Sequence, residues 1–256
     1  MASISNNTFA EDAILKARVE DAVRLCKRRS APVFIGFLDE RQQAIAKGMF
    51  SAADDVTYSF WGGHDDGERA LLGVSPAFMP TENDWFPITI MAFHYRTGQS
   101  ITHRDVLGSL LASGVKREML GDILCADGLA VVFAKDEVVS YLQSEISKIG
   151  GEGVRCEVPF CGVLPQAHTF VTRRDTVASP RLDAVLRICL AVSREEAAKR
   201  IESGLVSVNH MICESVSAEV HEHDVLSIRG AGRFRVAQIG PPSKKGRLFV
   251  TVEQYT

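Results

Sequence analysis

The stretch "SPRLDAVLRICLAVSREEAAKRIESGLVSVN", Ser179–Asn209, combines two apolar helical stripes with an unusual number of cations. Ser179 and Pro180 are typical of a helix cap followed by proline at the first helical position. Ser193 with Glu196 indicates a capping box for a second helix. The apolar residues recur at helical spacing: Leu182, Val185, Leu186 and Cys189, then Ala197, Ala198 and Ile201. Two helices closed by glycine and followed by a small basic sheet are therefore predicted.

The cations of this stretch are not required by a small core. Arg181 and Arg194 are predicted to lie in first helical turns, where the helix dipole disfavours a positive charge. Helix N-termini attract phosphate, and an arginine there adds a charged bidentate donor. Arg187 points away from the apolar stripe, so packing does not need it. This pattern indicates contact with an RNA backbone.

The predicted RNA-binding set extends from the helices into the following strands and their turns. Its members are Arg181, Asp183, Arg187, Ser193, Arg194, Arg200, Asn209, Arg229, Arg233, Arg235, Lys244 and Lys245. Two simpler interpretations stay open. Arg194 could form a structural salt bridge with Asp183, and Arg187 and Arg200 could be ordinary solvated residues.

Composition limits the classes that the chain can belong to. The 256 residues carry a net charge of −3, which by itself argues against a nucleic-acid binder. The charge is uneven, however, because residues 1–172 have 16 Lys+Arg against 22 Asp+Glu, whereas residues 173–256 have 13 against 10. One end is thus suited to an anionic partner. We expect a cytoplasmic monomer, with no membrane span, no secretory signal and reduced cysteines.

No catalytic residue, metal site or cofactor is predicted. The six cysteines form no C-x-x-C pair. The segment "HEHD" (221–224) could bind a metal, but a surface turn is favoured. The segment "GGHDDGER" (62–69) could bind a cation, but a hairpin turn is favoured. His103 could act as a base, although its place after a helix cap favours a structural role.

The remaining chain predicts an α+β protein of several domains. Residues 1–80 show helical and extended segments typical of an α/β domain. Residues 81–165 show the order βαββαβ, with a hairpin at Asp127-Gly128, which is the ferredoxin-like pattern. Residues 166–178 are interpreted as a linker, and residues 179–256 as a domain of two helices plus a small β-sheet with a C-terminal hairpin.

The C-terminal motifs resemble the small RNA-binding domain named after ribosomal protein S-four, here called the S-four domain. "PRLDAVLRICLAVSREEAAKRIESGLVSVN…DVLSIRGAGRF" contains the pieces of that family in order. His210 is a departure, because many members have glycine after the asparagine. "FWGGHDDGERALLGVSP" and "ITHRDVLGSLLASGVKREMLGDI" extend the resemblance over nearly the whole chain to YlmH-type proteins of Gram-positive bacteria.

The resemblance implies a function that spacing alone does not. YlmH-type proteins are associated with ribosome quality control and are thought to bind the large ribosomal subunit with stalled peptidyl-tRNA. The expected partners are therefore structured RNA (rRNA and tRNA) and the large ribosomal subunit. Two alternatives remain: an RNA-modifying enzyme of the pseudouridine synthase or methyltransferase type, and a protein-binding adaptor linked to cell division.

Overall fold

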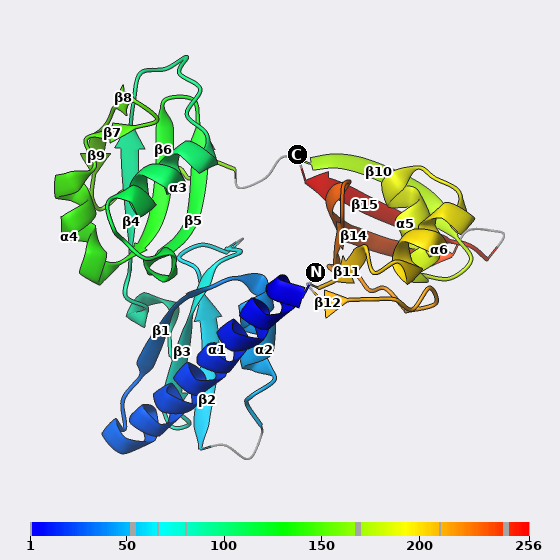
Figure 1. Cartoon of the computed structure of the whole chain (residues 1–256), viewed down its shortest axis with the longest axis horizontal. Helices are drawn as coiled ribbons and strands as arrows, with labels where there is room; N and C mark the ends of the chain where they lie inside the picture. The colour runs from blue at the N-terminus through cyan, green and yellow to red at the C-terminus, as the bar shows by residue number, and fades with distance from the viewer. Residues whose placement is uncertain are drawn as a thin grey trace. The chain divides into compact units, whose positions relative to one another are not determined.

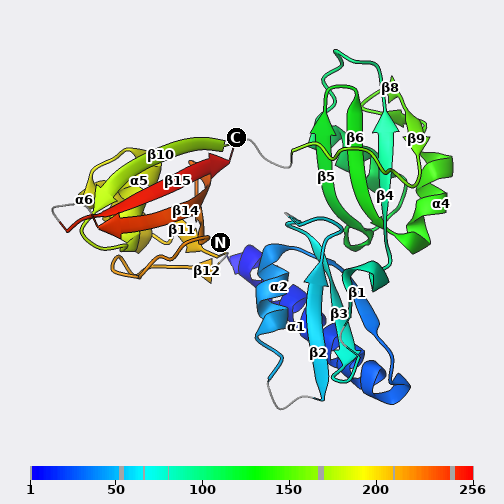
Figure 2. The ribbon, with the colours of Figure 1, turned by 180° about the vertical axis from the view of Figure 1, so that it is seen from behind.

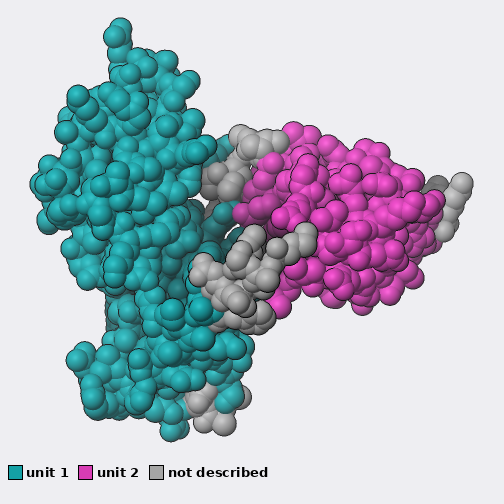
Figure 3. Space-filling model, viewed as in Figure 1, with its two compact units in different colours: residues 1–167 teal, residues 168–256 magenta. Residues whose placement is uncertain are grey.

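The computed structural model describes residues 2–51, 55–65, 67–79, 81–166, 170–209, 211–242 and 246–255. These residues form two compact units of mixed helix and sheet, Met1–Ala167 and His168–Thr256 (Figure 3). The expected α+β class is confirmed. Within the described ranges, no helix combines the length and the apolar character needed to cross a membrane.

The first half of the N-terminal unit is an antiparallel sheet covered by a long helix. Its elements are α1 (Ala2–Arg29), β1 (Val33–Leu38), α2 (Glu40–Lys47), β2 (Val56–Trp61) and β3 (Ala70–Pro76), with the strand order β1-β3-β2. Leu15, Val19 and Cys26 lie on one side of α1 at helical spacing and are buried against Ile35 and Leu72. Figure 1 shows α1 lying across this face of the sheet.

The second half of this unit confirms the βαββαβ order. Its elements are η1 (Asn83–Trp85), β4 (Ile88–His94), α3 (His103–Ala112), η2 (Arg117–Met119), β5 (Leu120–Ala126), β6 (Leu129–Lys135), α4 (Asp136–Glu145), β7 (Lys148–Ile149), β8 (Glu152–Gly153) and β9 (Arg155–Glu157). The antiparallel sheet has the order β5-β6-β4-β9. Thr102 and Asp105 form the expected capping box at the start of α3. Helices α3 and α4 bury Val106 and Leu142 against the sheet.

A shared apolar cluster joins these two halves into one unit. It contains Phe37, Leu71, Phe86, Ala92, Leu124, Val131, Phe133 and Phe160. Glycines allow the close approach. A Cβ atom on Gly36 would lie 2.6 Å from the Glu118 carbonyl oxygen, and one on Gly121 would lie 2.6 Å from the Phe37 ring. Residues 1–80 and 81–165, predicted as separate domains, thus pack around a common core.

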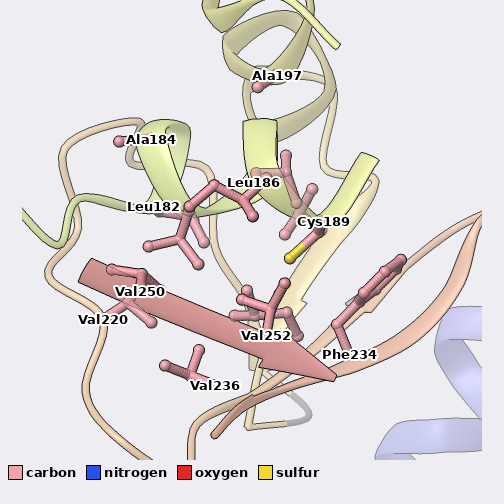
Figure 4. Close-up of a cluster of buried hydrophobic side chains, with 14 of the residues drawn as sticks. Leu182, Ala184, Leu186, Cys189, Ala197, Val220, Phe234, Val236, Val250 and Val252 are labelled. Atoms are coloured by element: carbon pink, nitrogen blue, oxygen red, sulfur yellow. The ribbon is translucent and has the colours of Figure 1, made fainter. Parts of the chain in front are cut away.

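The C-terminal unit contains a larger antiparallel sheet with two helices on one face. Its elements are β10 (Phe170–Val177), α5 (Leu182–Leu190), α6 (Arg194–Glu202), β11 (Val206–Val208), β12 (Met211–Ile212), β13 (Val225–Ile228), β14 (Gly232–Pro242) and β15 (Leu248–Tyr255). The strand order is β10-β15-β14-β13-β11-β12. In Figure 4, Leu182, Leu186 and Cys189 point toward Val250 and Val252 of β15.

Strand β10 occupies most of the segment that the sequence predicts to be a linker. Each of its residues pairs with one residue of β15, from Phe170 opposite Tyr255 to Val177 opposite Leu248. This pairing joins segments about eighty residues apart, so no local turn signal reveals it. Residues 170–177 therefore belong to the C-terminal sheet, which makes β10 an edge strand of that unit.

Helix α5 begins two residues later than predicted. Arg181 is its N-cap residue, and neither Ser179 nor Pro180 is helical. The first backbone N–H groups of the helix find other acceptors, since Leu182 donates to the Ala218 carbonyl at 2.8 Å and Asp183 donates to that of Val216 at 3.2 Å. These bonds satisfy N–H groups that a capping side chain would otherwise serve.

We predict that Gly121→Ala destabilises the N-terminal unit by about 1–3 kcal/mol, because the new methyl group overlaps the buried Phe37 ring. Thermal unfolding followed by tryptophan fluorescence measures this directly, since Trp61 and Trp85 are the two tryptophans of the chain and both belong to this unit. Gly108→Ala is the control. A Cβ atom there meets nothing within 4 Å, so alanine should stabilise α3 by about 0.5–1 kcal/mol. A Gly121→Ala protein as stable as wild type would contradict the packing described.

Candidate nucleic-acid interface

A buried carboxylate beneath two arginines lies at the start of the helical pair. Asp183, in the first turn of α5, is 4% exposed. Arg194 Nε donates to one of its oxygens at 2.6 Å, and Arg181 Nε donates to the other at 3.3 Å. The two arginine side chains remain 56% and 43% exposed. Asp183 therefore holds the two guanidinium groups in place while they stay accessible to solvent.

Charge and hydrogen bonding keep Asp183 ionised. Burial raises the pKa of its carboxyl group, but the hydrogen bonds and charges of Arg194 and Arg181 outweigh burial and lower the pKa below its usual value. The hydrogen bond to Asp183 raises the pKa of Arg194 in turn. The predicted alternative of a salt bridge between Arg194 and Asp183 is thus what the structure contains. Because most of the Arg194 side chain is exposed, the same residue can also meet a ligand.

A basic pocket of about 310 Å³ lies beside this pair. Its charged lining residues are Arg187, Arg194, Arg247 and Asp175. Arg187 Nη2 donates to Asp175 at 2.7 Å, and Arg247 donates to the Thr176 hydroxyl and carbonyl oxygens at 3.1 and 2.6 Å. The hydroxyl-bearing residues Thr176 and Ser179 also line it. Three arginines and one carboxylate thus line the pocket, and the Asp183 carboxylate pairs with Arg194 from beneath.

Helix α6 positions Arg194 at its first residue, as predicted. The Ser193 side chain accepts from the Glu196 backbone N–H at 3.2 Å. The expected capping box is incomplete, because the Glu196 carboxylate accepts from Arg200 Nε at 3.1 Å. Ser193 thus orients α6, and Arg200 is occupied by an ion pair on the helix surface.

Asn209 has a structural role in the strand-to-turn junction. Its φ of 47° places it in the left-handed region that asparagine tolerates. Its side chain accepts from the Val225 N–H at 2.9 Å and donates to Asp224 at 2.7 Å. These bonds link the turn after β11 to the start of β13. Arg229 is exposed directly after β13, where its backbone N–H donates to the Leu205 carbonyl at 2.9 Å.

The two arginines of β14 lie on the other face of the sheet. Arg233 and Arg235 alternate with Phe234 and Val236, which are buried beneath the helices. Arg235 lies over the Phe170 ring at 4.8 Å, and Arg233 lies over the Tyr255 ring at 4.9 Å. Figure 2 shows this side of β10, β15 and β14, with the helices behind. The predicted set is thereby divided between two faces.

Other predicted features have different outcomes. Lys244, Lys245 and His210 lie outside the described residues. In the segment 221–224, the Asp224 carboxylate accepts from the His221 N–H at 2.8 Å, as in a turn. No group of three or more potential metal ligands is present among the residues that the structure describes. Burial lowers the pKa of His103, which lies at the first position of α3.

Sequence reasoning missed Asp175, which lines the basic pocket. It also placed Arg173 and Arg174 in a linker, although both belong to β10. Arg173 donates to the Cys189 carbonyl and to Gln254 Oε1, so it attaches the strand to α5 and β15. The charged run Arg173-Arg174-Asp175 could have indicated that this segment is functional. Which of its side chains share a face could not be predicted without knowing that the segment is a strand, because side chains alternate along strands.

We predict that Asp183→Asn destabilises the C-terminal unit by about 1–3 kcal/mol at neutral pH, because two charged donors lose their ionised acceptor. The folded pKa of Asp183 is lowered, so its contribution is present above the unfolded pKa of about 3.9 and is lost as pH falls through the folded pKa. Scanning calorimetry at pH 7 and at a pH below that unfolded value should show that the stability difference between wild type and variant becomes smaller as the pH falls.

Asp175→Asn is the matched control, since Asp175 is 49% exposed and its pair with Arg187 should contribute at most about 1 kcal/mol. Tryptophan fluorescence should show unchanged melting of the N-terminal unit in both variants. Equal stability of the Asp183→Asn protein and wild type at pH 7 would argue that the two arginines are not held by Asp183.

Comparisons with known proteins agree with this architecture. Residues 80–159 match the family described as "Putative RNA-binding domain in YlmH", and residues 180–226 match the "S4 domain" family. A Bacillus subtilis (strain 168) protein named "Ribosome-associated protein quality control protein P2" is 33% identical over 223 residues, which cover 85% of each chain. A solved structure titled "Cell division protein ylmH from Streptococcus pneumoniae" has a similar fold, with a TM-score of 0.50 and 21% identity, over 58% of this chain and 90% of that one. The chain therefore belongs to the YlmH family, and its C-terminal unit contains an S-four domain.

Proposed function

We propose that the protein binds structured RNA on the ribosome through the surface formed by Arg181, Arg187, Arg194 and Arg247. The observation that carries the proposal is the buried Asp183 carboxylate, which fixes two exposed guanidinium groups beside a positively charged pocket. Fixed arginines bind phosphate with little loss of side-chain entropy, because the carboxylate has already restricted them. We call these four residues the arginine surface.

The geometry suits recognition of RNA shape better than reading of bases. A guanidinium group can donate two parallel hydrogen bonds to one phosphate. Hydroxyl groups such as that of Thr176 commonly add hydrogen bonds to the phosphate backbone. Folded RNA presents regularly spaced phosphates and 2′-hydroxyls to such a surface. The arginine surface would therefore select a folded element over a single-stranded sequence.

The ribosome is the proposed location of this RNA. The relative at 33% identity is named for ribosome-associated protein quality control. We propose rRNA and peptidyl-tRNA on the large subunit as the ligands, bound by a monomer in the cytoplasm. The excess of acidic residues in the first 172 residues fits a composite partner, since it would repel loosely bound RNA.

The proposed role is non-catalytic. The alternative of a pseudouridine synthase requires an aspartate that reaches a base, and the R-L-D aspartate of this chain is Asp183. Its side chain is 6% exposed, and both carboxylate oxygens accept from arginines. Asp183 is thus a positioning residue in this proposal and not a nucleophile.

We predict that Arg187→Gln and Arg194→Gln each weaken binding of the full-length protein to ribosomal RNA by roughly 5–150-fold. Glutamine is preferable to glutamate at Arg194, because a second carboxylate would face the buried Asp183. The slope of log affinity against log salt concentration should also become shallower, by about one for each phosphate that the variant no longer neutralises. Arg200→Gln is the matched control, since Arg200 pairs with Glu196 and does not line the pocket. Equal losses of affinity in all three variants would contradict the assignment of the arginine surface.

We predict that the tagged full-length protein sediments with free large ribosomal subunits, and more so when translation is stalled. The double variant Arg187→Gln/Arg194→Gln should move to the top of the gradient, because it no longer neutralises two of the RNA phosphates. Calorimetry should show that the variant remains folded. Co-sedimentation that persists in the folded double variant, or that is absent under stalling, would contradict the proposal.

A further inference from the structure

A second basic pocket, of about 420 Å³, lies in the N-terminal unit at the junction of its two sheets. Its positive lining residues are Arg18, Arg69, Lys116 and Arg117, and they outnumber its two carboxylates, Asp39 and Glu118. They come from α1, from the loop before β3 and from the segment at η2. Arg69 is the last residue of "GGHDDGER", and Lys116, Arg117 and Glu118 belong to "GVKRE"; the arginine surface uses neither motif.

Two half-buried guanidinium groups converge in this pocket. Arg69 Nε and Arg117 Nη1 donate to the same acceptor, the Leu120 carbonyl oxygen, at 3.2 and 2.6 Å. Arg69 also donates to the Phe37 carbonyl at 2.7 Å, and Arg117 to that of Gly121 at 3.1 Å. Two like charges are thus held together by neutral acceptors. Such an arrangement is unfavourable unless an anion compensates it.

The neighbouring carboxylates are committed to other groups. Asp122 accepts from the backbone N–H groups of Glu68 and Arg69 and contacts His64 Nε2 at 3.1 Å. The Asp39 side chain caps α2. Glu118 pairs with Arg18 at 2.6 Å. Within the described part of the chain, neither Arg69 nor Arg117 forms an ion pair with a carboxylate.

Electrostatics agrees with this geometry. Burial, followed by the charge of Arg69, lowers the pKa of Arg117 to about 10, and the charges of Asp122 and Asp39 oppose this shift only in part. Burial likewise lowers the pKa of Arg69. Both groups stay protonated at neutral pH, yet each carries its charge at a cost. A bound anion would stabilise the two positive charges, whereas water can solvate half-buried groups only in part.

We propose that this pocket binds a phosphate group, either from RNA or from a free phosphorylated molecule. Arginine forks match the oxygens of phosphate in a bidentate manner, and the exposed Lys116 at the rim adds a further positive charge. The pocket is also large enough for the group to which a phosphate is attached. The site belongs to the N-terminal unit and is separate from the arginine surface.

Inorganic phosphate is the probe that tests the site in the full-length protein. Tryptophan fluorescence reports melting of the N-terminal unit, because both tryptophans lie there. Phosphate at ten times its dissociation constant should raise the melting temperature by roughly 3–6 °C, and the rise should then follow the logarithm of phosphate concentration. Phosphate also stabilises proteins without binding, so chloride at equal ionic strength and a variant of the site are both needed.

Lys116→Glu is the main variant, since this exposed lysine can change without disturbing the core. It should raise the dissociation constant for phosphate roughly tenfold or more. Lys148→Glu is the control, because this lysine is exposed and does not line the pocket, and its dissociation constant should be unchanged. Arg117→Gln should abolish the phosphate effect if the protein folds; if it does not fold, Lys116→Glu decides. An equal phosphate response in wild type, Lys116→Glu and Lys148→Glu would overturn the proposal.

RNA titration then identifies the source of the phosphate. If Lys116→Glu weakens RNA binding and Lys148→Glu does not, the pocket binds a phosphate of RNA. If RNA binding is unchanged while the response to inorganic phosphate is abolished, the ligand is a free phosphorylated molecule. Both results support a phosphate site. Neither depends on the outcome for Arg187 and Arg194, so failure of one proposal is distinguishable from failure of the other.

Discussion

The ionised Asp183 carboxylate, buried at the start of α5, determines how the S-four domain presents its positive charge. A carboxylate removed from water needs hydrogen-bond donors of opposite charge, and Arg181 and Arg194 supply them. Arg181 comes from the N-cap of α5, and Arg194 comes from the first turn of α6. The ion pair therefore fixes the two helix starts relative to each other. It also places two guanidinium groups where the helix dipoles alone would disfavour them.

The basic residues of this unit lie on two faces of the sheet, because side chains alternate along its strands. Asp175 of β10 faces the helices and reaches Arg187 of α5. Arg233 and Arg235 of β14 face away and lie over aromatic rings. A linear list of cations cannot show this division, because it depends on the pairing of β10 with β15. The helical face combines fixed arginines with a pocket, whereas the opposite face combines arginines with rings.

The sequence predicts features that depend on local periodicity and fails where distant segments meet. The helices α5 and α6, the capping box at Thr102 and the βαββαβ order follow from patterns within short windows. Strand β10 was missed because its partner lies at the other end of the unit. The start of α5 was misplaced because the Ala218 and Val216 carbonyls satisfy its first N–H groups. In both cases the hydrogen-bond partners are distant in the sequence, so no local pattern can predict them.

The two units hold arginines by opposite means, and the difference has a physical consequence. In the S-four domain, Asp183 neutralises part of the charge of Arg181 and Arg194, so a ligand gains from their fixed orientation as well as from the remaining exposed charge. At the junction of the two N-terminal sheets, carbonyl oxygens hold Arg69 and Arg117, and the charges of Asp39 and Asp122 compensate them only in part. A ligand there gains chiefly from charge in a half-buried setting, where screening by salt is weaker than at the surface. Added salt should therefore weaken binding at the exposed arginine surface more than binding in the half-buried pocket.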